Sequence, residues 1–299
     1  MVDPVDRLWI LDTGSPMFQQ TRVGPPKLSC VDLATNRVMK RIIFPREVAL
    51  PTTYLNDLRF DLRRGAEGTA YITDSVDQEP NGIIVVDLAT GDSWRRLHDH
   101  PTTKAIPPPD FLPVEGRALM ERQPDDTTKP VTMRSEGIAI GADGARLYYC
   151  PLASRRLFSV SAEALADRSL SDDAVAATVR DEGDKGGGAD GLESDAAGRI
   201  YVTGYEHNAI LRQNPDGLGD GGARHAPALA GHNVPRYRRV SLRHGEPVAS
   251  PVEMPEWEGP SAQALFPVPH PPGCSAGAAA VTTRRHPAVR IQARITARA

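Results

Sequence analysis

A short phrase recurs four times along this chain, and it decides the fold. The four copies are DPVDRLWILD (Asp3–Asp12), EGTAYITD (Glu67–Asp74), ADGARLYYC (Ala142–Cys150) and DAAGRIYVTG (Asp195–Gly204). Each copy has a polar turn, then an aromatic residue in a short apolar run, then a small or acidic stop. The aromatics Trp9, Tyr71, Tyr148 and Tyr201 lie 62, 77 and 53 residues apart. Strands and turns that recur at so loose a period predict a radial or solenoidal β architecture.

A second repeat surrounds this phrase and indicates successive antiparallel meanders. Apolar strands with a polar start precede three of the aromatics, as YLNDLRFDL (Tyr54–Leu62), SEGIAIGA (Ser135–Ala142) and ADGLESDA (Ala189–Ala196). Two outer hairpins are nearly identical: KLSCVDLATNRVMKRIIFP from Lys27 and GIIVVDLATGDSWRRLHD from Gly82. Asn36 and Gly91 mark the turns of these hairpins, because Asn and Gly tolerate the positive φ that a hairpin turn requires. Four strands in a unit of about 50 residues are typical of a β-propeller blade.

Two segments between the predicted blades are expected to form loops on a propeller face. Residues His100–Thr132 are rich in Pro, Asp and Thr and cannot hold a regular strand over most of their length. Residues Ser161–Asp173 favour a short helix. Loops on a rigid scaffold commonly carry binding specificity.

Composition excludes several classes of protein. The 299 residues carry a formal net charge of -3, without the basic footprint of a nucleic-acid binder. No apolar run reaches the roughly 18 residues of a membrane span. The start of the chain has neither region of a signal peptide and runs almost directly into a strand, which predicts a missing upstream portion. Cys30, Cys150 and Cys274 show no metal-ligand spacing, so one disulfide and buried free thiols both stay open.

The last part of the chain has a different composition. Residues 218–299 hold 11 of the 27 prolines, 5 of the 8 histidines, no lysine and one aspartate, Asp220. A disordered tail is one interpretation. Another is translation out of frame, because Val240–Val252 read from the second base of each codon permits Tyr-Leu-Tyr-Val-Thr-Ala-Asn-Gln-Leu-His-Arg-Gln, a fifth aromatic phrase. We expect blades over residues 1–217 and an out-of-frame, largely disordered or irregular segment over 218–299.

Six longer phrases carry a family resemblance. They are LWILDTG (Leu8–Gly14), KLSCVDLATNRV (Lys27–Val38), YLNDLRFD (Tyr54–Asp61), GIIVVDLATGDSWRRL (Gly82–Leu97), LYYCPLASRRLFSV (Leu147–Val160) and YEHNAILR (Tyr205–Arg212). As a linked set they resemble the major royal jelly protein/Yellow family, in particular its bacterial members, over about residues 1–217. More distantly, the blade phrase is similar to gluconolactonase-like propellers. The resemblance implies an all-β, six-bladed β-propeller, incomplete in this chain, which begins inside an early blade and keeps about four recognisable blades.

Polar residues at the start of the inner strands are the candidate ligand site. A propeller binds ligands in the funnel at the centre of one face, which the pairs Asn56-Asp57, Glu136-Gly137 and Asp190-Gly191 would line. In gluconolactonase-like propellers the matching positions supply metal ligands and a general base, so the resemblance implies Asn56, Glu136 and Asp190 as ligands of a divalent cation. Carboxylate and amide oxygens suit a hard cation such as calcium. The alternative is that these side chains have only a structural role and accept hydrogen bonds from backbone N–H groups of a turn.

A second candidate group is Glu206 and His207, which follow the fourth phrase where a loop should turn toward a face. Together they offer acid–base chemistry or contacts to an ammonium group at the rim of the funnel. A polar loop that only hydrogen-bonds its neighbours is the alternative. The run Gly186–Gly188 lacks the strand-then-helix context of a phosphate loop and is predicted to be a loop or hinge.

Three functional hypotheses follow. The favoured one is a Yellow/royal-jelly-type propeller that binds a small aromatic or amine-bearing ligand in its central funnel, since insect members of the family bind biogenic amines. The alternative is a metal-dependent gluconolactonase-like lactonase or a dopachrome-type isomerase. The third is a product that binds nothing because its ring is incomplete. The resemblance also implies a secreted or periplasmic protein, and we expect a monomer when the ring is complete.

Overall fold

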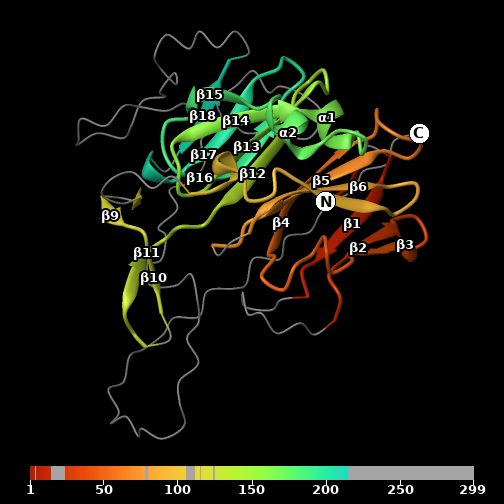
Figure 1. The fold of residues 1–299 in the computed structure, drawn as a ribbon, viewed down its shortest axis with the longest axis horizontal. Coiled ribbons are helices and arrows are strands. Elements are labelled where there is room, and N and C mark those ends of the chain that lie inside the picture. The colour runs from red at the N-terminus through yellow and green to blue at the C-terminus, as the bar shows by residue number, and fades with distance from the viewer. Residues whose placement is uncertain are drawn as a thin grey trace, which may run out of the picture. The chain divides into compact units, whose positions relative to one another are not determined.

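Four antiparallel sheets of three or four strands follow one another along the described part of the chain in the computed structural model (Figure 1), and two two-stranded sheets lie between the second and third of them. The structure describes residues 1–214 apart from 4, 15–23, 78–79, 106–111, 115, 124 and 208, all within the compact unit Met1–Pro251. Blade 1 consists of β1 (Arg7–Asp12), β2 (Lys27–Asp32) and β3 (Arg37–Ile43). Blade 2 consists of β4 (Leu55–Asp61), β5 (Thr69–Asp74), β6 (Gly82–Asp87) and β7 (Ser93–Arg96). Blade 3 consists of β12 (Ser135–Ile140), β13 (Arg146–Pro151), β14 (Arg156–Ser161) and β15 (Arg180–Asp184). Blade 4 consists of β16 (Ala189–Ser194), β17 (Ile200–Gly204) and β18 (Ala209–Gln213).

The repeated aromatics occupy equivalent positions, as predicted. Each lies near the start of its strand, as the third residue of β1, β5 or β13 or the second of β17, and within blades 2, 3 and 4 that strand is the second of the sheet. Trp9 pairs with Cys30 as Tyr71 pairs with Val85, at matching positions of the two similar hairpins. The turns predicted at Asn36 and Gly91 have φ values of 54° and 82°. The chain is therefore all-β, with the successive meanders of a β-propeller.

Three of the aromatics pack toward the blade that follows their own. The Trp9 ring lies 5.2 Å from that of Phe60 in blade 2. The Tyr71 hydroxyl donates to the carbonyl of Ala162, which directly follows β14 of blade 3, and Tyr148 packs against the cluster between blades 3 and 4. Burial of each such ring contributes about 2–3 kcal/mol. The repeat therefore encodes the contact between one blade and the next.

An aspartate clamp explains the polar turn of the phrase in blades 1 and 4. Asp3 accepts hydrogen bonds from Trp9 Nε1 at 2.8 Å and from Arg7 Nε at 2.7 Å. Asp195, which has the same spacing, accepts from the Tyr201 hydroxyl at 2.9 Å and from its own Arg neighbour. The spacing Asp-x-x-x-Arg-x-aromatic thus fixes the turn to the aromatic ring, which in blade 1 packs on the next blade.

The N-terminal residues partly replace an inner strand in blade 1. Trp9 N donates to Met1 O at 2.8 Å, and Val2 forms a bridge with Leu8. The face of this blade that lies away from the Trp9 ring is apolar and exposed to solvent. Ile10 is 48% exposed and Leu33 40%, whereas the corresponding positions in blade 2, Ile72 and Leu88, are 0% exposed.

The connections between strands carry the remaining elements. Between blades 2 and 3 lie η2 (Pro101–Thr103), β8 (Pro113–Val114), β9 (Arg117–Ala118), β10 (Met120–Arg122) and β11 (Thr128–Pro130). Within blade 3, between β14 and β15, lie α1 (Ala162–Ala166) and α2 (Asp172–Ala176), and within blade 4 lies η3 (Tyr205–His207). The single helix expected over Ser161–Asp173 is two short helices, because Ser161 and Ser171 each cap a separate N-terminus. The described strands of His100–Thr132 are two or three residues long, in keeping with its proline content.

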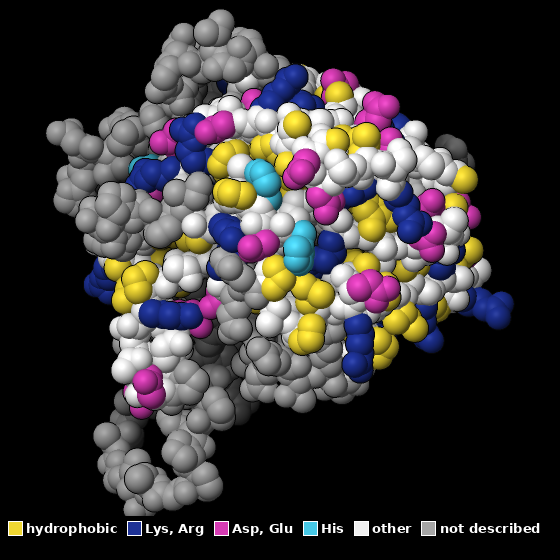
Figure 2. Space-filling view, in the orientation of Figure 1, with side chains coloured by type: hydrophobic (Ala, Val, Ile, Leu, Met, Phe, Trp, Pro, Cys, Tyr) yellow, Lys and Arg dark blue, Asp and Glu magenta, His cyan; other side chains and the backbone are white. Residues whose placement is uncertain are grey.

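Other predictions from the sequence have mixed outcomes. Cys30 and Cys150 are both buried free thiols, which settles the alternative left open for them. None of the described helices is long and apolar enough to cross a membrane. On the face seen in Figure 2, acidic and basic side chains are interspersed. The out-of-frame hypothesis for residues 218–299 lies outside the described residues.

Candidate functional site

Three β-bulges bring the predicted site residues together. The register of the inner strands shifts between Leu55 and Leu58 in β4, between Ser135 and Gly137 in β12, and between Ala189 and Leu192 in β16. Each bulge contains one of the three predicted ligands, Asn56, Glu136 and Asp190. A bulge re-aims a side chain relative to a regular strand. The inner strands β4, β12 and β16 are neighbours in space, so the three bulges meet at one end of them.

Glu136 is the centre of the site. Its side chain accepts a hydrogen bond at Oε1 from Asn56 Nδ2, and the residue is only 5% exposed. Its second oxygen, Oε2, is buried without a hydrogen-bond partner. Burial first, and then the nearby Asp190 carboxylate, raise the pKa of Glu136 to about 8. Glu136 is therefore protonated at neutral pH. Glu136 and Asp190 are called the acidic pair below.

Three further residues contact the acidic pair and were not identified from the sequence. The Tyr205 hydroxyl hydrogen-bonds Asp190, and burial followed by that negative charge raises its pKa. Burial and then the charge of Glu136 raise the pKa of Tyr54. Ser75, 1% exposed, donates to Ser135 O at 2.7 Å, and its hydroxyl lowers the pKa of the neighbouring Glu136 against the effect of burial. Tyr54 and Tyr205 are the first residues of two of the phrases that carry the family resemblance, and the sequence offers no other indication of their position.

Asp57 lies beside this group and makes other contacts. It accepts at Oδ1 from Arg59 Nη1 at 2.6 Å and from Leu58 N at 2.8 Å. Burial raises its pKa, although the Arg59 charge opposes that effect. Arg59 also donates to Leu192 O at 2.6 Å. This hydrogen bond joins blade 2 to blade 4 two residues after Asp190 in β16.

Glu206 and His207 both lie in η3, next to Tyr205. Glu206 accepts from Arg155 Nη2 at 2.6 Å and from Gly188 N at 3.2 Å, and its side chain is 6% exposed. Glu206 therefore holds the predicted glycine loop in place. Lys185, at the start of that loop, donates to the Ser154 carbonyl and is 4% exposed, and burial lowers its pKa.

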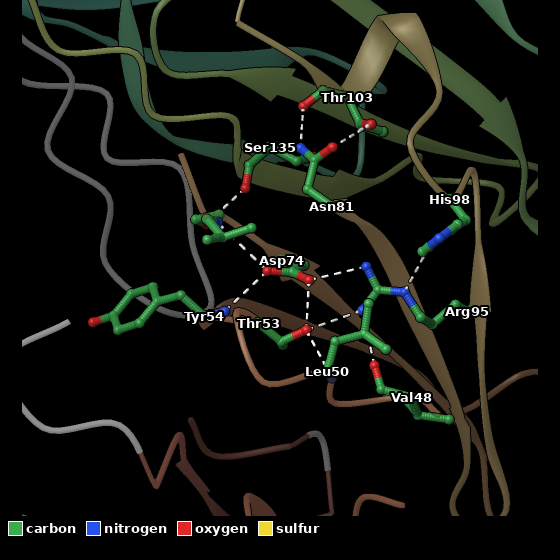
Figure 3. A network of polar contacts seen from close by, with 12 residues as sticks. Val48, Leu50, Thr53, Tyr54, Asp74, Asn81, Arg95, His98, Thr103 and Ser135 are labelled. Atoms are coloured by element: carbon green, nitrogen blue, oxygen red, sulfur yellow. Dashed lines mark hydrogen bonds and ion pairs between the residues drawn. The ribbon is translucent and has the colours of Figure 1, made fainter. Parts of the chain in front are cut away.

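A buried ion pair anchors the segment that leads into β4 (Figure 3). Asp74 accepts from Arg95 Nη2 at 2.9 Å, from Tyr54 N at 2.9 Å and from Thr53 Oγ1 at 2.8 Å. Arg95 also donates to Val48 O at 2.8 Å. Because the Asp74 side chain is 0% exposed and all its partners are in place, the network fixes the backbone from which Tyr54 extends.

The donor set fits an organic cation better than a metal ion. The exposed Asp190 carboxylate offers negative charge and Glu136 Oε2 offers a buried oxygen without a donor, but Asn56 presents its amide nitrogen to Glu136. A calcium ion would require the Asn56 amide oxygen instead. Within the described part of the chain, no three His, Cys, Asp or Glu side chains gather into a metal cluster.

Comparisons with known proteins agree with the sequence phrases. A sequence profile described as "Major royal jelly protein" matches residues 1–218. Protein yellow of Drosophila erecta is 28% identical over 185 residues, which cover 58% of this chain and 31% of that protein. Major royal jelly protein 7 of Apis mellifera is 30% identical over 164 residues, 54% of this chain and 33% of that protein. The chain thus spans about a third of the length of the curated relatives it matches.

Similar solved structures are more remote. Hydrazine synthase of Kuenenia stuttgartiensis has a TM-score of 0.45 and 13% identity, with 71% of this chain and 57% of that chain covered. A gluconolactonase from Xanthomonas campestris has a TM-score of 0.39 and 14% identity, with 72% and 57% covered. Likeness at these scores carries no functional weight.

Proposed function

Since the chain belongs to the major royal jelly protein family, we propose that it binds a small aromatic ligand bearing an ammonium group at the acidic pair. The observation that carries the proposal is the buried, unpartnered Glu136 Oε2 beside Asp190. A buried polar atom without a partner costs free energy, and an ammonium group would supply both the missing hydrogen bond and the compensating charge.

The surroundings favour an organic cation with an aromatic body. Tyr54 and Tyr205, both partly buried, bring aromatic side chains near the acidic pair. Tyr205 also packs against an apolar cluster formed by Leu112, Leu152 and Ala153. Aromatic faces attract cations, and apolar surface favours the body of an arylalkylamine. Charge recognition would thus come from the acidic pair and shape recognition from the loops around it.

Glu136 would act in this binding by exchanging a proton for the ligand. At neutral pH its carboxyl group is protonated, because burial and Asp190 raise its pKa to about 8. An ammonium ion stabilises the ionised form, so binding should release a proton to solvent. The Asn56 amide would hold the Glu136 carboxylate in place during this exchange.

Titration calorimetry with tyramine tests the proposal. We expect heat with tyramine and none with 4-methylphenol, which keeps the ring and lacks the amine. Glu136→Gln should weaken binding about 10- to 100-fold, since a hydrogen bond to a charged group is worth about 1.5–3 kcal/mol. The matched control Glu193→Gln changes an exposed carboxylate of the same strand, β16, which lines a pocket at the other end of the inner strands, away from the acidic pair. Equal heats for tyramine and 4-methylphenol would contradict the proposal.

The lactonase and isomerase alternative predicts a different result. A metal-dependent enzyme should bind calcium at millimolar concentration and turn over a sugar lactone or dopachrome. Absence of calcium heat removes the metal-dependent reading, since oxygen-ligand sites of extracellular proteins bind calcium in about that range. We further propose, on the family resemblance, that the protein acts outside the cytoplasm and as a monomer.

A further inference from the structure

We propose that the side chain two residues after the repeated aromatic, in blades 2, 3 and 4, positions the ligand site by holding the three bulges open. The residues are Thr73, Cys150 and Thr203. They are positioning residues, because each acts on the backbone beside a site residue and not on a ligand. The effect on ligand affinity rests on the proposed function, whereas the effect on site geometry does not.

Blade 2 shows the arrangement most fully. Thr73 Oγ1 accepts a hydrogen bond from Asp57 N at 3.0 Å, and Asp57 directly follows the site residue Asn56. The same hydroxyl donates to the Glu136 carbonyl at 3.1 Å, in the neighbouring blade. Thr73 is 0% exposed. One hydroxyl therefore joins the backbone of Asn56 to that of Glu136 and sets their separation.

Blade 4 repeats the arrangement at the equivalent position. Thr203 Oγ1 accepts from Gly191 N at 2.8 Å and donates to Gly191 O at 3.3 Å. Gly191 directly follows the site residue Asp190. Thr203 itself is exposed, so water can satisfy its hydroxyl, and burial alone does not account for its two hydrogen bonds to Gly191.

Blade 3 has a thiol at this position. Cys150 Sγ donates to the Ala189 carbonyl at 4.0 Å in the neighbouring blade, and Ala189 directly precedes the site residue Asp190. Blade 1 has Leu11 at this position and so lacks a hydrogen-bonding side chain there. A hydroxyl or thiol therefore occupies this position in the three described blades that contribute a site residue, and blade 1, which contributes none, lacks one.

The physical reason is that a bulge changes the hydrogen bonds of the strand backbone. A bulge leaves an N–H without its partner in the strand ladder, and a buried N–H must find another acceptor. A hydroxyl on the adjacent strand supplies it in blades 2 and 4. Without that acceptor the strand would regain regular register, and the alternation of side chains would turn the site residue away from the others.

Paired substitutions at Thr73 and Thr203 separate positioning from general stability. Thr→Val keeps the shape and removes the acceptor, whereas Thr→Ser keeps the acceptor. The matched control is Thr69→Val, a buried position in the same strand as Thr73 that lies at its far end. The first readout, on the ligand-free protein at fixed pH, is the NMR resonance of the Asn56 side-chain amide for Thr73 variants and of the Asp190 carboxyl for Thr203 variants.

We expect both Val variants to move those resonances, both Ser variants to restore them and Thr69→Val to leave them in place. The second readout is tyramine affinity, which should fall about tenfold in the Val variants for the loss of one hydrogen bond. Resonances that stay unchanged in Thr203→Val would overturn the proposal, and this exposed position decides the question if Thr73→Val does not fold. Moved resonances in a protein that binds no tyramine would support positioning and refute the proposed function.

Discussion

Glu136→Gln should raise the free energy of unfolding at alkaline pH. The size of the increase follows from the raised pKa of the buried Glu136 carboxyl. Glu136 has a pKa of about 8 in the folded protein and 4.5 as an ordinary glutamate. Between those values the folded state binds a proton that the unfolded state does not. The free energy of unfolding is therefore highest in acid and falls as pH rises, by about 1.4 kcal/mol per pH unit. From pH 5 to pH 8 this group alone lowers it by about 3–4 kcal/mol.

Glutamine mimics the protonated acid and cannot ionise. Its amide keeps an oxygen for Asn56 Nδ2 and offers an N–H toward Asp190. Urea unfolding at pH 5, 6, 7 and 8 should give nearly equal free energies for variant and wild type at pH 5. The variant should gain about 3–4 kcal/mol relative to wild type by pH 8. A difference between the two proteins that is the same at all four pH values would refute the reasoning.

Three other outcomes are expected. Asp3→Asn should lower the free energy of unfolding by about 1–3 kcal/mol in urea melts, because the carboxylate accepts from Trp9 Nε1, while Asp6→Asn, at an exposed turn, should not. Gly188→Ala should lower the melting temperature, because its Cβ would lie 2.1 Å from Leu112 Cδ1; a melting temperature equal to that of wild type would show that the loop adjusts freely. The nucleotide sequence should show a single-base insertion or deletion near codon 217, where the family match also ends, relative to an intact relative; an uninterrupted frame would remove the out-of-frame hypothesis.

The blades could be predicted because their signal is local and repeated. Trp9, Tyr71 and Tyr148 each sit in an apolar strand beside a turn, and the contact they make with the next blade recurs with the phrase. The hairpin turns at Asn36 and Gly91 were equally predictable, since positive φ restricts the residue type.

The site was harder to predict, because its geometry depends on contacts between blades. Asn56, Glu136 and Asp190 were found as polar residues at strand starts, but alternation along a strand gives no hint of a bulge. Tyr205 reaches Asp190 from η3, and Ser75 reaches Glu136 from the end of β5 in another blade. Neither contact leaves a pattern within its own segment. Glu206 carried a strong local signal, yet its partners Arg155 and Gly188 come from blade 3 and the loop after it.

A crystal structure of the protein with tyramine tests the central claim most directly. We expect the amine nitrogen within hydrogen-bond distance, about 2.7–3.2 Å, of Glu136 Oε2, with the Asp190 carboxylate beside it. We also expect the ring of tyramine between Tyr54 and Tyr205. Tyramine bound elsewhere, for example in the pocket lined by Arg59, Arg63 and Ser194 at the other end of the inner strands, with the acidic pair empty, would contradict the account.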